Sequence, residues 1–259
     1  MMKGKVNGPA DIAWRIHHKV ETASTNLDAL AGGHGDVFTA DFQAAGRGRL
    51  DHKWLSPPGT NLMMSAVLSV ADLAPDHAAT LPLVAGLAVV KAVSQMLVRG
   101  QDVRRKTQDV MLKWPNDVLV DGKKIAGILC ERNGDNVIVG IGVNVGQTEF
   151  DVEFADRATS LAVLAPSVVP CLSPCVLSVR TAVLRELGHW YSVWRAGGFA
   201  AVHPEIAALD FLRGRTISVR QTDDDSAPIS GVSNGIMSDG SLDVGGTRVY
   251  AGEAHVESL

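Results

Sequence analysis

Residues 43–65 read Gln-Ala-Ala-Gly-Arg-Gly-Arg-Leu-Asp-His-Lys-Trp-Leu-Ser-Pro-Pro-Gly-Thr-Asn-Leu-Met-Met-Ser. Residues 46–49 place two arginines among glycines, shortly after an apolar run, residues 37–40, that predicts a strand. Glycine lets the backbone approach a ligand closely, and arginine offers a planar fork of donors for phosphate or carboxylate. The stretch predicts either a solvated basic turn or a mobile loop that wraps an anion. It does not match the phosphate-loop pattern GxxxxGK[ST].

The composition is that of an ordinary globular protein. The chain has 259 residues, which allows one large domain or a large and a small one. Apolar residues make up 46% and charged residues 20%, so the core needs no disulfide staples. The formal net charge of −4 provides no bulk attraction to nucleic acid, although a local basic patch is compatible with it.

The cysteines and the apolar segments bear on where the protein acts. Cys130, Cys171 and Cys175 form no disulfide framework and no zinc motif. Such usage fits a reducing compartment, so we predict a cytoplasmic protein. Residues 1–13 lack an apolar run long enough for a signal peptide. The most apolar stretch, residues 81–97, is interrupted by polar residues and is expected to be too short for a membrane span, so it predicts a buried helix and no membrane partner.

Ser24 and Thr25 lie between a predicted strand, residues 14–20, and a predicted short helix that ends near Leu30. Serine and threonine are favoured helix N-caps, because their side-chain oxygen accepts a hydrogen bond from a backbone N–H group. Capping is one prediction for these hydroxyls. The other is that the hydroxyls and the free N–H groups of the helix face a small polar ligand, and the two predictions are compatible.

A second informative segment, residues 110–117, reads Val-Met-Leu-Lys-Trp-Pro-Asn-Asp. Lys113 ends the predicted strand, and Pro115 favours an extended backbone at the residue before it. A lysine in this place is either solvated, as at most strand ends, or held by its bulky neighbours. Further along, Asp121-Gly122 suits a type I′ turn, which predicts a hairpin.

Residues 136–145 predict another strand, which contains Gly140 and Gly142 and is followed closely by Gly146. A dinucleotide-binding motif is excluded, because no helix and no βαβ unit follow these glycines. Glycines within a strand indicate that another group approaches the backbone closely. Asn144 offers a side-chain amide at the same place.

After this strand, the sequence predicts a short capped helix near residues 158–161 and an amphipathic helix over residues 176–196. The amphipathic helix aligns Val179, Val183, Leu187, Tyr191 and Trp194 at helical spacing. We predict that this face packs in the core and does not stack on nucleic-acid bases.

From about Leu212 onward, short β runs alternate with turn signals at Asn234-Gly235, Asp239-Gly240 and Gly245-Gly246. This pattern predicts a small all-β barrel. The chain is therefore expected to divide into a large domain, residues 12–209, and the small barrel, residues 210–259.

Four separated motifs together resemble those of the biotin–protein ligases, also called biotin–[acetyl-CoA-carboxylase] ligases. The motifs are Ser24-Thr25-Asn26, then Gln43 with Gly46-Arg47-Gly48-Arg49 and Trp54-Leu55-Ser56-Pro57, then Lys113-Trp114-Pro115-Asn116-Asp117 with Lys124-Ile125-Ala126-Gly127-Ile128-Leu129, and Gly140-Ile141-Gly142-Val143-Asn144. The resemblance covers about residues 14–165 and extends more weakly to residues 231–242. It implies an α+β fold, with a mixed-sheet catalytic domain like those of class II synthetases and lipoate ligases and a small C-terminal SH3-like β-barrel.

The resemblance also implies an ATP-dependent, AMP-forming reaction in two steps. Biotin and Mg·ATP give biotinyl-5′-adenylate and pyrophosphate, and a lysine of a biotin carboxyl carrier domain then takes the biotinyl group and releases AMP. The implied small molecules are biotin, ATP and Mg²⁺, with no metal ion held by the protein itself. A lipoate or octanoate ligase and a non-catalytic biotin-binding paralogue are the alternatives.

Residue roles follow from the same resemblance. Lys113, Arg47 and Arg49 are expected to be catalytic. Biotin is expected to contact Ser24, Thr25, Asn26, Gln43, Gly46, Arg47, Gly48, Arg49, Lys113 and Gly127. ATP is expected to contact Arg49, Trp54, Asn144 and Lys113.

The sequence departs from the family pattern within residues 46–54, the arginine loop. Family members continue this loop as Gly-Arg-Gly-Arg-x-Gly-Arg-x-Trp, whereas this chain has Asp51-His52 in place of the second Gly-Arg pair. An acid near a phosphate bears on how tightly the adenylate is held, and His52 or Lys53 is the candidate for the missing cation.

The partner expectations follow from the same comparison. Few residues precede the first predicted strand, so we expect no DNA-binding domain and no DNA partner. The expected partner is the carrier domain of a biotin-dependent carboxylase, and both a monomer and a homodimer remain open.

Overall fold

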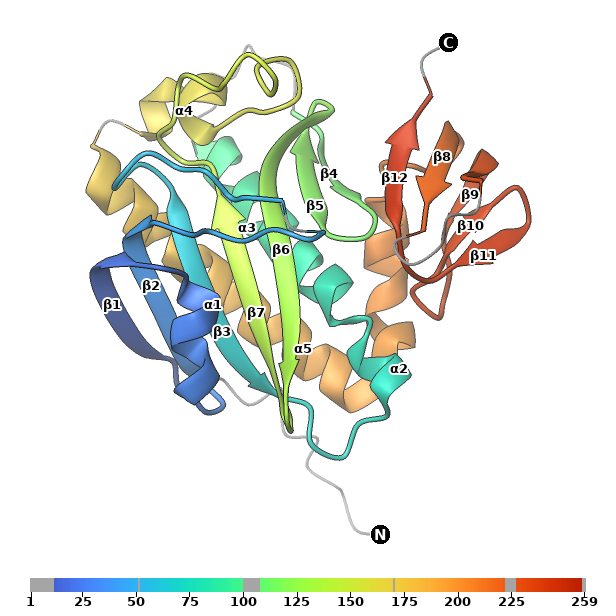
Figure 1. Cartoon of the computed structure of the whole chain (residues 1–259), viewed down its shortest axis with the longest axis horizontal. Helices are drawn as coiled ribbons and strands as arrows, with labels where there is room; N and C mark the ends of the chain where they lie inside the picture. Colours follow the sequence, from blue (N-terminus) through green and yellow to red (C-terminus); the bar gives the residue numbers. More distant parts are fainter. Residues whose placement is uncertain (1–11, 51, 100–107, 170, 222–226, 258–259) are drawn as a thin grey trace, which may run out of the picture.

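The computed structural model describes residues 12–50, 52–99, 108–169, 171–221 and 227–257. Two sheets organise these residues (Figure 1). The larger sheet has seven strands in the order β1-β2-β3-β7-β6-β5-β4, and the smaller has five in the order β11-β10-β9-β8-β12. In the larger sheet β1 and β2 pair in parallel, and the other neighbours pair antiparallel. The sheet is therefore mixed, as predicted.

The strands of the larger sheet match the apolar runs of the sequence. They are β1 (Arg15–Thr22), β2 (Asp36–Gln43), β3 (Leu62–Ser69), β4 (Val110–Lys113), β5 (Asp117–Val120), β6 (Lys123–Asn133) and β7 (Asn136–Val143). The helical elements are α1 (Thr25–Asp28), η1 (Ala29–Ala31), α2 (Pro75–Ala78), α3 (Leu81–Arg99), α4 (Leu161–Leu164), η2 (Pro166–Val168) and α5 (Leu172–Ala208).

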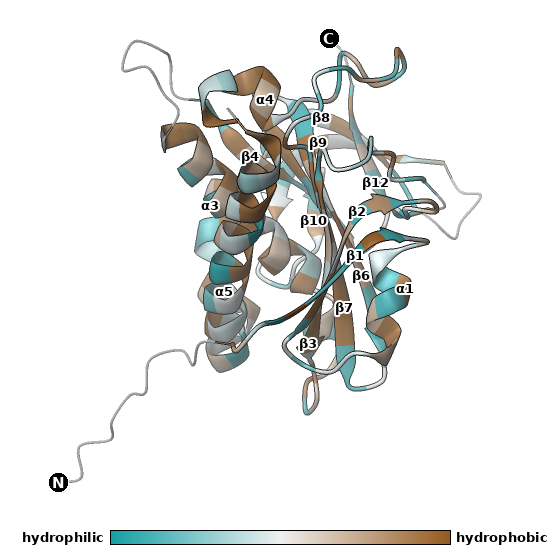
Figure 2. Ribbon diagram, turned by 90° about the vertical axis from the view of Figure 1, so that its left-hand side faces the viewer, coloured by the Kyte–Doolittle hydropathy of each residue, from teal (hydrophilic) through white to brown (hydrophobic). Residues whose placement is uncertain are grey.

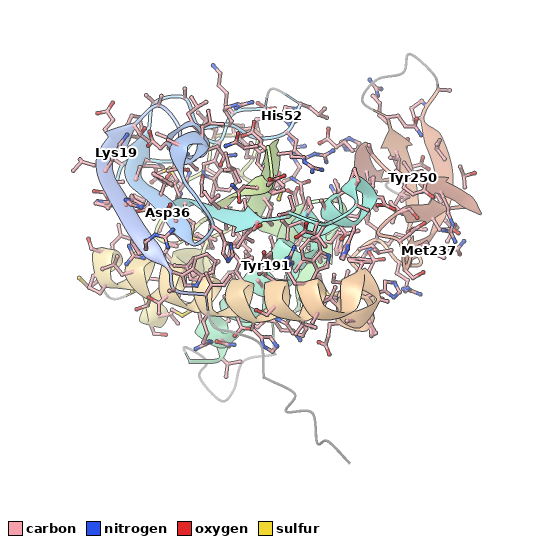
Figure 3. All side chains as sticks on the ribbon, turned by 90° about the horizontal axis from the view of Figure 1, so that it is seen from below. Lys19, Asp36, His52, Tyr191, Met237 and Tyr250 are labelled. Atoms are coloured by element: carbon pink, nitrogen blue, oxygen red, sulfur yellow. The ribbon has the colours of Figure 1, made fainter. Side chains whose placement is uncertain are left out.

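The core lies between the larger sheet and the two long helices. Figure 2 shows α3 and α5 on one side of this sheet and α1 on the other. The predicted apolar face of α5 is buried, and Trp194 has no exposed surface. Tyr191 reaches from α5 to the sheet, where its hydroxyl donates to the Ser69 carbonyl at 2.6 Å (Figure 3). The two helices thus leave the α1 side of the sheet for the functional site.

The segment Pro75–Val98 is, among the described helices, long and apolar enough to cross a membrane by length and composition alone. The expectation that this stretch is too short for a span is therefore wrong. Its most apolar window is 72% buried inside the protein. Leu81, Val84 and Leu87 of α3 have no exposed surface, so the segment packs as the buried helix that the sequence predicts.

Local turn and cap signals are partly confirmed. Asp121 and Gly122 both have positive φ, 50° and 82°, as a type I′ turn between β5 and β6 requires. Ser160 caps α4 and accepts a hydrogen bond from the Val163 N–H at 3.2 Å. Ser24 occupies the N-cap position of α1, but its side chain makes no capping hydrogen bond. The capping prediction is therefore wrong for Ser24.

The smaller sheet contains β8 (Thr216–Arg220), β9 (Ile229–Ile236), β10 (Leu242–Val244), β11 (Thr247–Val249) and β12 (Glu253–Val256). Gly245-Gly246 forms the predicted turn between β10 and β11, with φ of 57° and 91°. The predicted turn at Asn234-Gly235 is wrong, because these residues lie inside β9. Gly235 has a φ of 103° where the pairing with β10 shifts register. Some β-bulges and some tight turns both use a glycine with positive φ, so the dipeptide alone does not separate them.

Asp210 joins the two sheets. It forms a β-bridge with Leu112 at the end of the larger sheet. Its Oδ1 accepts from the Leu212 N–H at 2.9 Å and its Oδ2 from the Ile236 N–H at 2.8 Å. Trp114, from the larger sheet, adds a hydrogen bond from its Nε1 to the Gly240 carbonyl at 3.1 Å. The smaller sheet is thus held next to the end of β4.

Asp210→Ala is expected to destabilise the protein, because it leaves two buried backbone N–H groups without an acceptor. A buried donor left unpaired costs about 1–3 kcal/mol. The free energy of unfolding in urea measures the loss. Asp151→Ala, at an exposed position, serves as the control. Equal stabilities for the two variants would contradict this account of the junction.

Candidate active site

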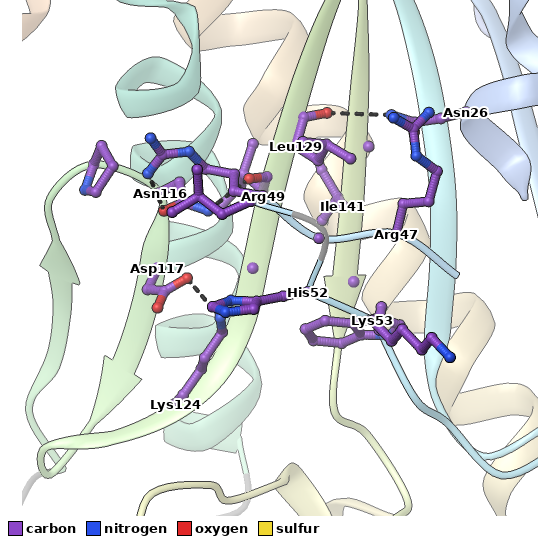
Figure 4. A pocket seen from close by; sticks show the side chains of 18 of the residues that line it. Asn26, Arg47, Arg49, His52, Lys53, Asn116, Asp117, Lys124, Leu129 and Ile141 are labelled. Atoms are coloured by element: carbon purple, nitrogen blue, oxygen red, sulfur yellow. Dashed lines mark hydrogen bonds and ion pairs between the residues drawn. The ribbon is translucent and has the colours of Figure 1, made fainter. Parts of the chain in front are cut away.

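A cavity lies where the larger sheet, the start of α1, the loop of residues 46–54 and β12 meet (Figure 4). Ten of the twelve predicted site residues line it: Ser24, Thr25, Asn26, Gln43, Arg47, Gly48, Arg49, Trp54, Lys113 and Gly127. Gly46 and Asn144 do not line it. Gly140, Ile141 and Gly142 also line it, so the structure gathers residues of all four sequence motifs around one space, although their individual roles stay predictions.

The polar end of the cavity is built by the parallel pairing of β1 and β2. This pairing puts Thr22 opposite Gln43 and brings the start of α1 beside the end of β2. The Gln43 Oε1 accepts from the Thr25 N–H at 2.7 Å and from the Thr25 hydroxyl at 3.0 Å. Gln43 thus satisfies a first-turn N–H group of α1, which leaves the Ser24 hydroxyl free of the capping role.

Two residues that the sequence analysis did not select extend this polar end. The buried Ser65 hydroxyl lies 2.7 Å from the Thr25 hydroxyl and donates to Asn26 Oδ1 at 2.5 Å. Glu131 then accepts from Asn26 Nδ2 at 2.6 Å and pairs with Arg47 Nη1 at 3.0 Å. The only local signal for Ser65 is a polar residue within an apolar strand, and Glu131 follows the Lys124–Leu129 motif by two positions.

The arginine loop folds back on itself. Trp54 N donates to the Gly46 carbonyl at 3.0 Å, and Gly48 N donates to the His52 carbonyl at 2.6 Å. A Cβ atom at Gly46 would overlap the Trp54 carbonyl oxygen. Gly46 therefore shapes the loop without lining the cavity. His52 and Lys53 both line the cavity, whereas Asp51 lies outside the described residues.

Arg49 connects the loop to the rest of the site. Its Nη1 donates to the Gly252 carbonyl at 3.1 Å and to Asn116 Oδ1 at 3.4 Å. Burial lowers the pKa of Arg49, while the Asp117 and Glu253 carboxylates act in the opposite direction. The loop is thereby tied to the turn after β4 and to the smaller sheet.

Two lysines line the cavity, Lys113 at the end of β4 and Lys124 near the start of β6. Burial lowers the pKa of Lys113, the Asp117 carboxylate acts against this change, and the Lys124 ammonium adds to it. Lys124 also lines the cavity and pairs with Asp117 at 2.7 Å between Nζ and Oδ1. The sequence predicts no separate role for Lys124. A partly buried cation with a lowered pKa is stabilised by an incoming anion.

The strand glycines make room for side chains of the cavity. Gly127 on β6 lies opposite Gly142 on β7. A Cβ atom at Gly142 would overlap the Trp54 ring, and one at Gly140 would overlap the Asn26 amide. The prediction that these glycines mark a close approach is confirmed. The Trp54 Nε1 is buried here without a hydrogen-bond partner.

Asn144 lies outside this arrangement. Its Nδ2 donates to the Thr159 carbonyl at 3.0 Å, and its backbone N–H donates to the Ile125 carbonyl at 2.8 Å. It therefore joins the end of β7 to the segment before α4. The expected contact with ATP receives no support from this geometry and stays a prediction.

Metal ligands and thiols contribute little to the described site. No group of three or more His, Cys, Asp or Glu side chains suited to a metal ion occurs within the described ranges. Cys130, Cys171 and Cys175 are free thiols. Burial raises the pKa of the Cys130 thiol, which keeps it protonated and weakly nucleophilic.

Comparison with known proteins places the chain in a family. Residues 21–147 match the model of the Biotin/lipoate A/B protein ligase family. The chain is 32% identical to the biotin–[acetyl-CoA-carboxylase] ligase of Mycobacterium tuberculosis, over 96% of this chain and 91% of that protein. The chain belongs to the biotin–protein ligase family. The resemblance drawn from the four motifs is confirmed.

Solved biotin protein ligases share the fold. The ligase from Aquifex aeolicus, in complex with biotin and ATP, superposes with a TM-score of 0.77 and 28% identity, over 94% of this chain and 99% of that one. The ligase from Leishmania major, in complex with biotinyl-5-AMP, gives a TM-score of 0.59 and 25% identity, with coverages of 94% and 98%. These likenesses confirm the predicted α+β, class II synthetase-like fold with a small antiparallel sheet at the C-terminal end.

Proposed function

We infer that the protein is a biotin–protein ligase, which activates biotin with ATP to biotinyl-5′-AMP and transfers the biotinyl group to a lysine. One observation carries this conclusion. A single cavity is lined both by neutral hydrogen-bonding side chains, among them Ser24, Thr25 and Gln43, and by the cations Arg47, Arg49, Lys113 and Lys124, in a chain similar over most of its length to a ligase of this kind. Such a cavity suits an acid with a polar head and a carboxylate that is joined to a phosphate.

In the first step, a carboxylate oxygen of biotin attacks the α-phosphorus of ATP. The new C–O–P linkage forms as the bond to the β-phosphate oxygen breaks, and pyrophosphate leaves. Two anions must approach each other, and fixed cations reduce that repulsion and stabilise the charge that develops on the phosphate. Lys113 and the two arginines are proposed for this role, with Lys124 beside them. Mg²⁺ would enter with ATP as part of the substrate.

In the second step, the neutral amine of an acceptor lysine attacks the biotinyl carbonyl carbon. An amide forms, the bond to AMP breaks, and the amine loses one proton. The protein needs no nucleophilic side chain of its own, because the two substrates form every new bond. The arginine loop, tied to the Gly252 carbonyl by Arg49, is proposed to exclude water from the reactive adenylate.

The acceptor is proposed to be the carrier domain of a biotin-dependent carboxylase. We further propose that residues 12–209 form the catalytic unit and residues 210–259 a C-terminal unit that completes the cavity. Glu253 and Ala254 of β12 line the cavity, which supports a contribution of the C-terminal unit to the site. A cytoplasmic location, the absence of a DNA partner and the choice between monomer and homodimer stay predictions.

An acid-exchange experiment tests this function against its alternatives. The purified protein is mixed with Mg·ATP and either biotin, lipoate or octanoate, without an acceptor, and pyrophosphate is measured. We expect a burst of about one equivalent with biotin, the kinetic signature of an accumulating activated intermediate. A larger burst with lipoate or octanoate would establish the sister activity. Biotin binding without pyrophosphate release would establish a non-catalytic paralogue.

A further inference from the structure

Glu131 holds together two parts of the cavity wall without lining the cavity itself. Its Oε2 accepts from Asn26 Nδ2 at 2.6 Å, at the start of α1. Its Oε1 pairs with Arg47 Nη1 at 3.0 Å, in the arginine loop. Figure 4 shows the Arg47 side chain reaching toward Asn26. The side chain of Glu131 is 30% exposed, so the pair is partly shielded from water.

The carboxylate of Glu131 fixes the orientation of the Asn26 amide. An ionised carboxylate and a backbone carbonyl only accept hydrogen bonds. Asn26 Nδ2 faces both the Glu131 Oε2 and, at 3.5 Å, the Leu129 carbonyl. The Nδ2 group must therefore point to Glu131 and the Oδ1 atom to Ser65, whose hydroxyl donates to it at 2.5 Å.

That orientation determines the direction of the remaining hydrogen bonds. A hydroxyl can donate only one hydrogen bond, and the Ser65 hydroxyl already donates to Asn26 Oδ1. The Thr25 hydroxyl must then donate, either to Ser65 at 2.7 Å or to Gln43 Oε1 at 3.0 Å. The Thr25 N–H also donates to Gln43 Oε1, which leaves the Gln43 amide nitrogen for other partners. The acceptor-only groups that face Asn26, of which Glu131 is nearer than Leu129 by 2.6 Å against 3.5 Å, thus set which atoms of this series donate and which accept.

We propose that Glu131 is a positioning residue for ligand binding, which sets the polarity of this hydrogen-bond chain and anchors Arg47 at the same time. The inference rests on the proposed function and goes beyond it, since Glu131 does not line the cavity. A ureido group has one carbonyl acceptor and two N–H donors, so its binding depends on a wall with a fixed arrangement of donors and acceptors. The Arg47 contact connects that wall to the loop that covers the adenylate.

Glu131→Gln is the deciding variant, because it keeps the size of the side chain and removes the acceptor-only charge. We expect the Kd for biotin, measured by titration calorimetry, to rise on the order of 10- to 100-fold, as for loss of hydrogen bonds to a charged group. The KM for ATP should change much less. Glu131→Asp should recover part of the affinity for biotin. Ser65→Ala should also raise the Kd for biotin, because it removes the hydrogen bond from Ser65 to Asn26.

Glu205→Gln is the matched control. Glu205 on α5 also pairs with a cation, Lys91, at 2.6 Å and lies outside the cavity lining. Its biotin affinity should equal that of the wild type. Thermal melting of each variant separates lost folding from lost affinity, and ATP binding to a folded Glu131→Gln protein provides a second check.

These measurements test the positioning role of Glu131 separately from the ligase function. Wild-type affinity in a folded Glu131→Gln protein would overturn the role of Glu131 and leave the ligase function intact. An equal loss of affinity for biotin and for ATP would show that Glu131 only supports the fold, and this result would also overturn the proposal. A wild-type protein that binds no biotin and releases no pyrophosphate would instead overturn the proposed function.

Discussion

Lys113→Ala is expected to slow formation of biotinyl-adenylate on the order of 100- to 1000-fold, by analogy with removal of a single transition-state donor. Lys113 ends β4 inside the cavity, where burial lowers its pKa. A charge held in a poorly solvated place interacts strongly with the anions of the reaction. The measurement is pyrophosphate release with biotin and Mg·ATP in rapid-quench experiments, with no acceptor present.

Two further lysines make this experiment decisive. Lys123 lies at the exposed start of β6, next to Lys124 in sequence, so Lys123→Ala should retain the wild-type burst. Lys124 pairs with Asp117 in the cavity, so Lys124→Ala should also slow the reaction. A normal burst in Lys113→Ala, combined with its loss in Lys124→Ala, would contradict our assignment and transfer the main role to Lys124.

The pH dependence of the burst provides a second readout for Lys113. The charged ammonium is the useful form, and burial lowers its pKa below that of an ordinary lysine. The burst rate should therefore fall as the pH rises through this lowered pKa, earlier than for a solvated lysine. Lys113→Arg, which stays charged at these pH values, should move the decline to higher pH. An alkaline limb that does not move would show that another group titrates.

Trp194→Ala is expected to lower the free energy of unfolding by about 3–5 kcal/mol, the range for loss of a large aromatic side chain in a core. Trp194 is completely buried between α5 and the α2–α3 region. Its Nε1 donates to the Thr80 hydroxyl at 2.9 Å, and its ring meets His77 at 4.5 Å between centroids. The truncation leaves a void in the core and removes the donor to the Thr80 hydroxyl, which keeps its own hydrogen bond to the His77 carbonyl at 2.7 Å. Urea denaturation measures the change.

Leu177→Ala is the control on the same helix. Leu177 is 50% exposed, and a surface substitution changes stability by about 0.5 kcal/mol or less. Similar losses for Trp194→Ala and Leu177→Ala would contradict the placement of the α5 face in the core. Neither Trp194 nor Leu177 lines the candidate active site. Below the melting transition, both variants should therefore bind biotin with the affinity of the wild type.

The sequence by itself determined the elements and the family. The Asp121-Gly122 turn, the buried face of α5 and the strands of the larger sheet follow from local periodicity and from residues with special φ angles. Such signals depend on neighbours within a few positions. The order of the Ser24, Gly46, Lys113 and Gly140 motifs indicated biotin–protein ligases, because each motif is a run of adjacent residues.

Only the tertiary structure decided how those motifs work together. Glu131 bonds to Asn26 across 105 positions of sequence, Ser65 bonds to Asn26 across 39, and Arg49 reaches Gly252 across 203. No local pattern encodes such pairings, since they depend on strand register and on the parallel contact of β1 with β2. For the same reason, the sequence did not separate the bulge at Gly235 from a turn or show that the Asn144 amide bonds to Thr159. Long-range hydrogen bonds become visible only when the chain is folded.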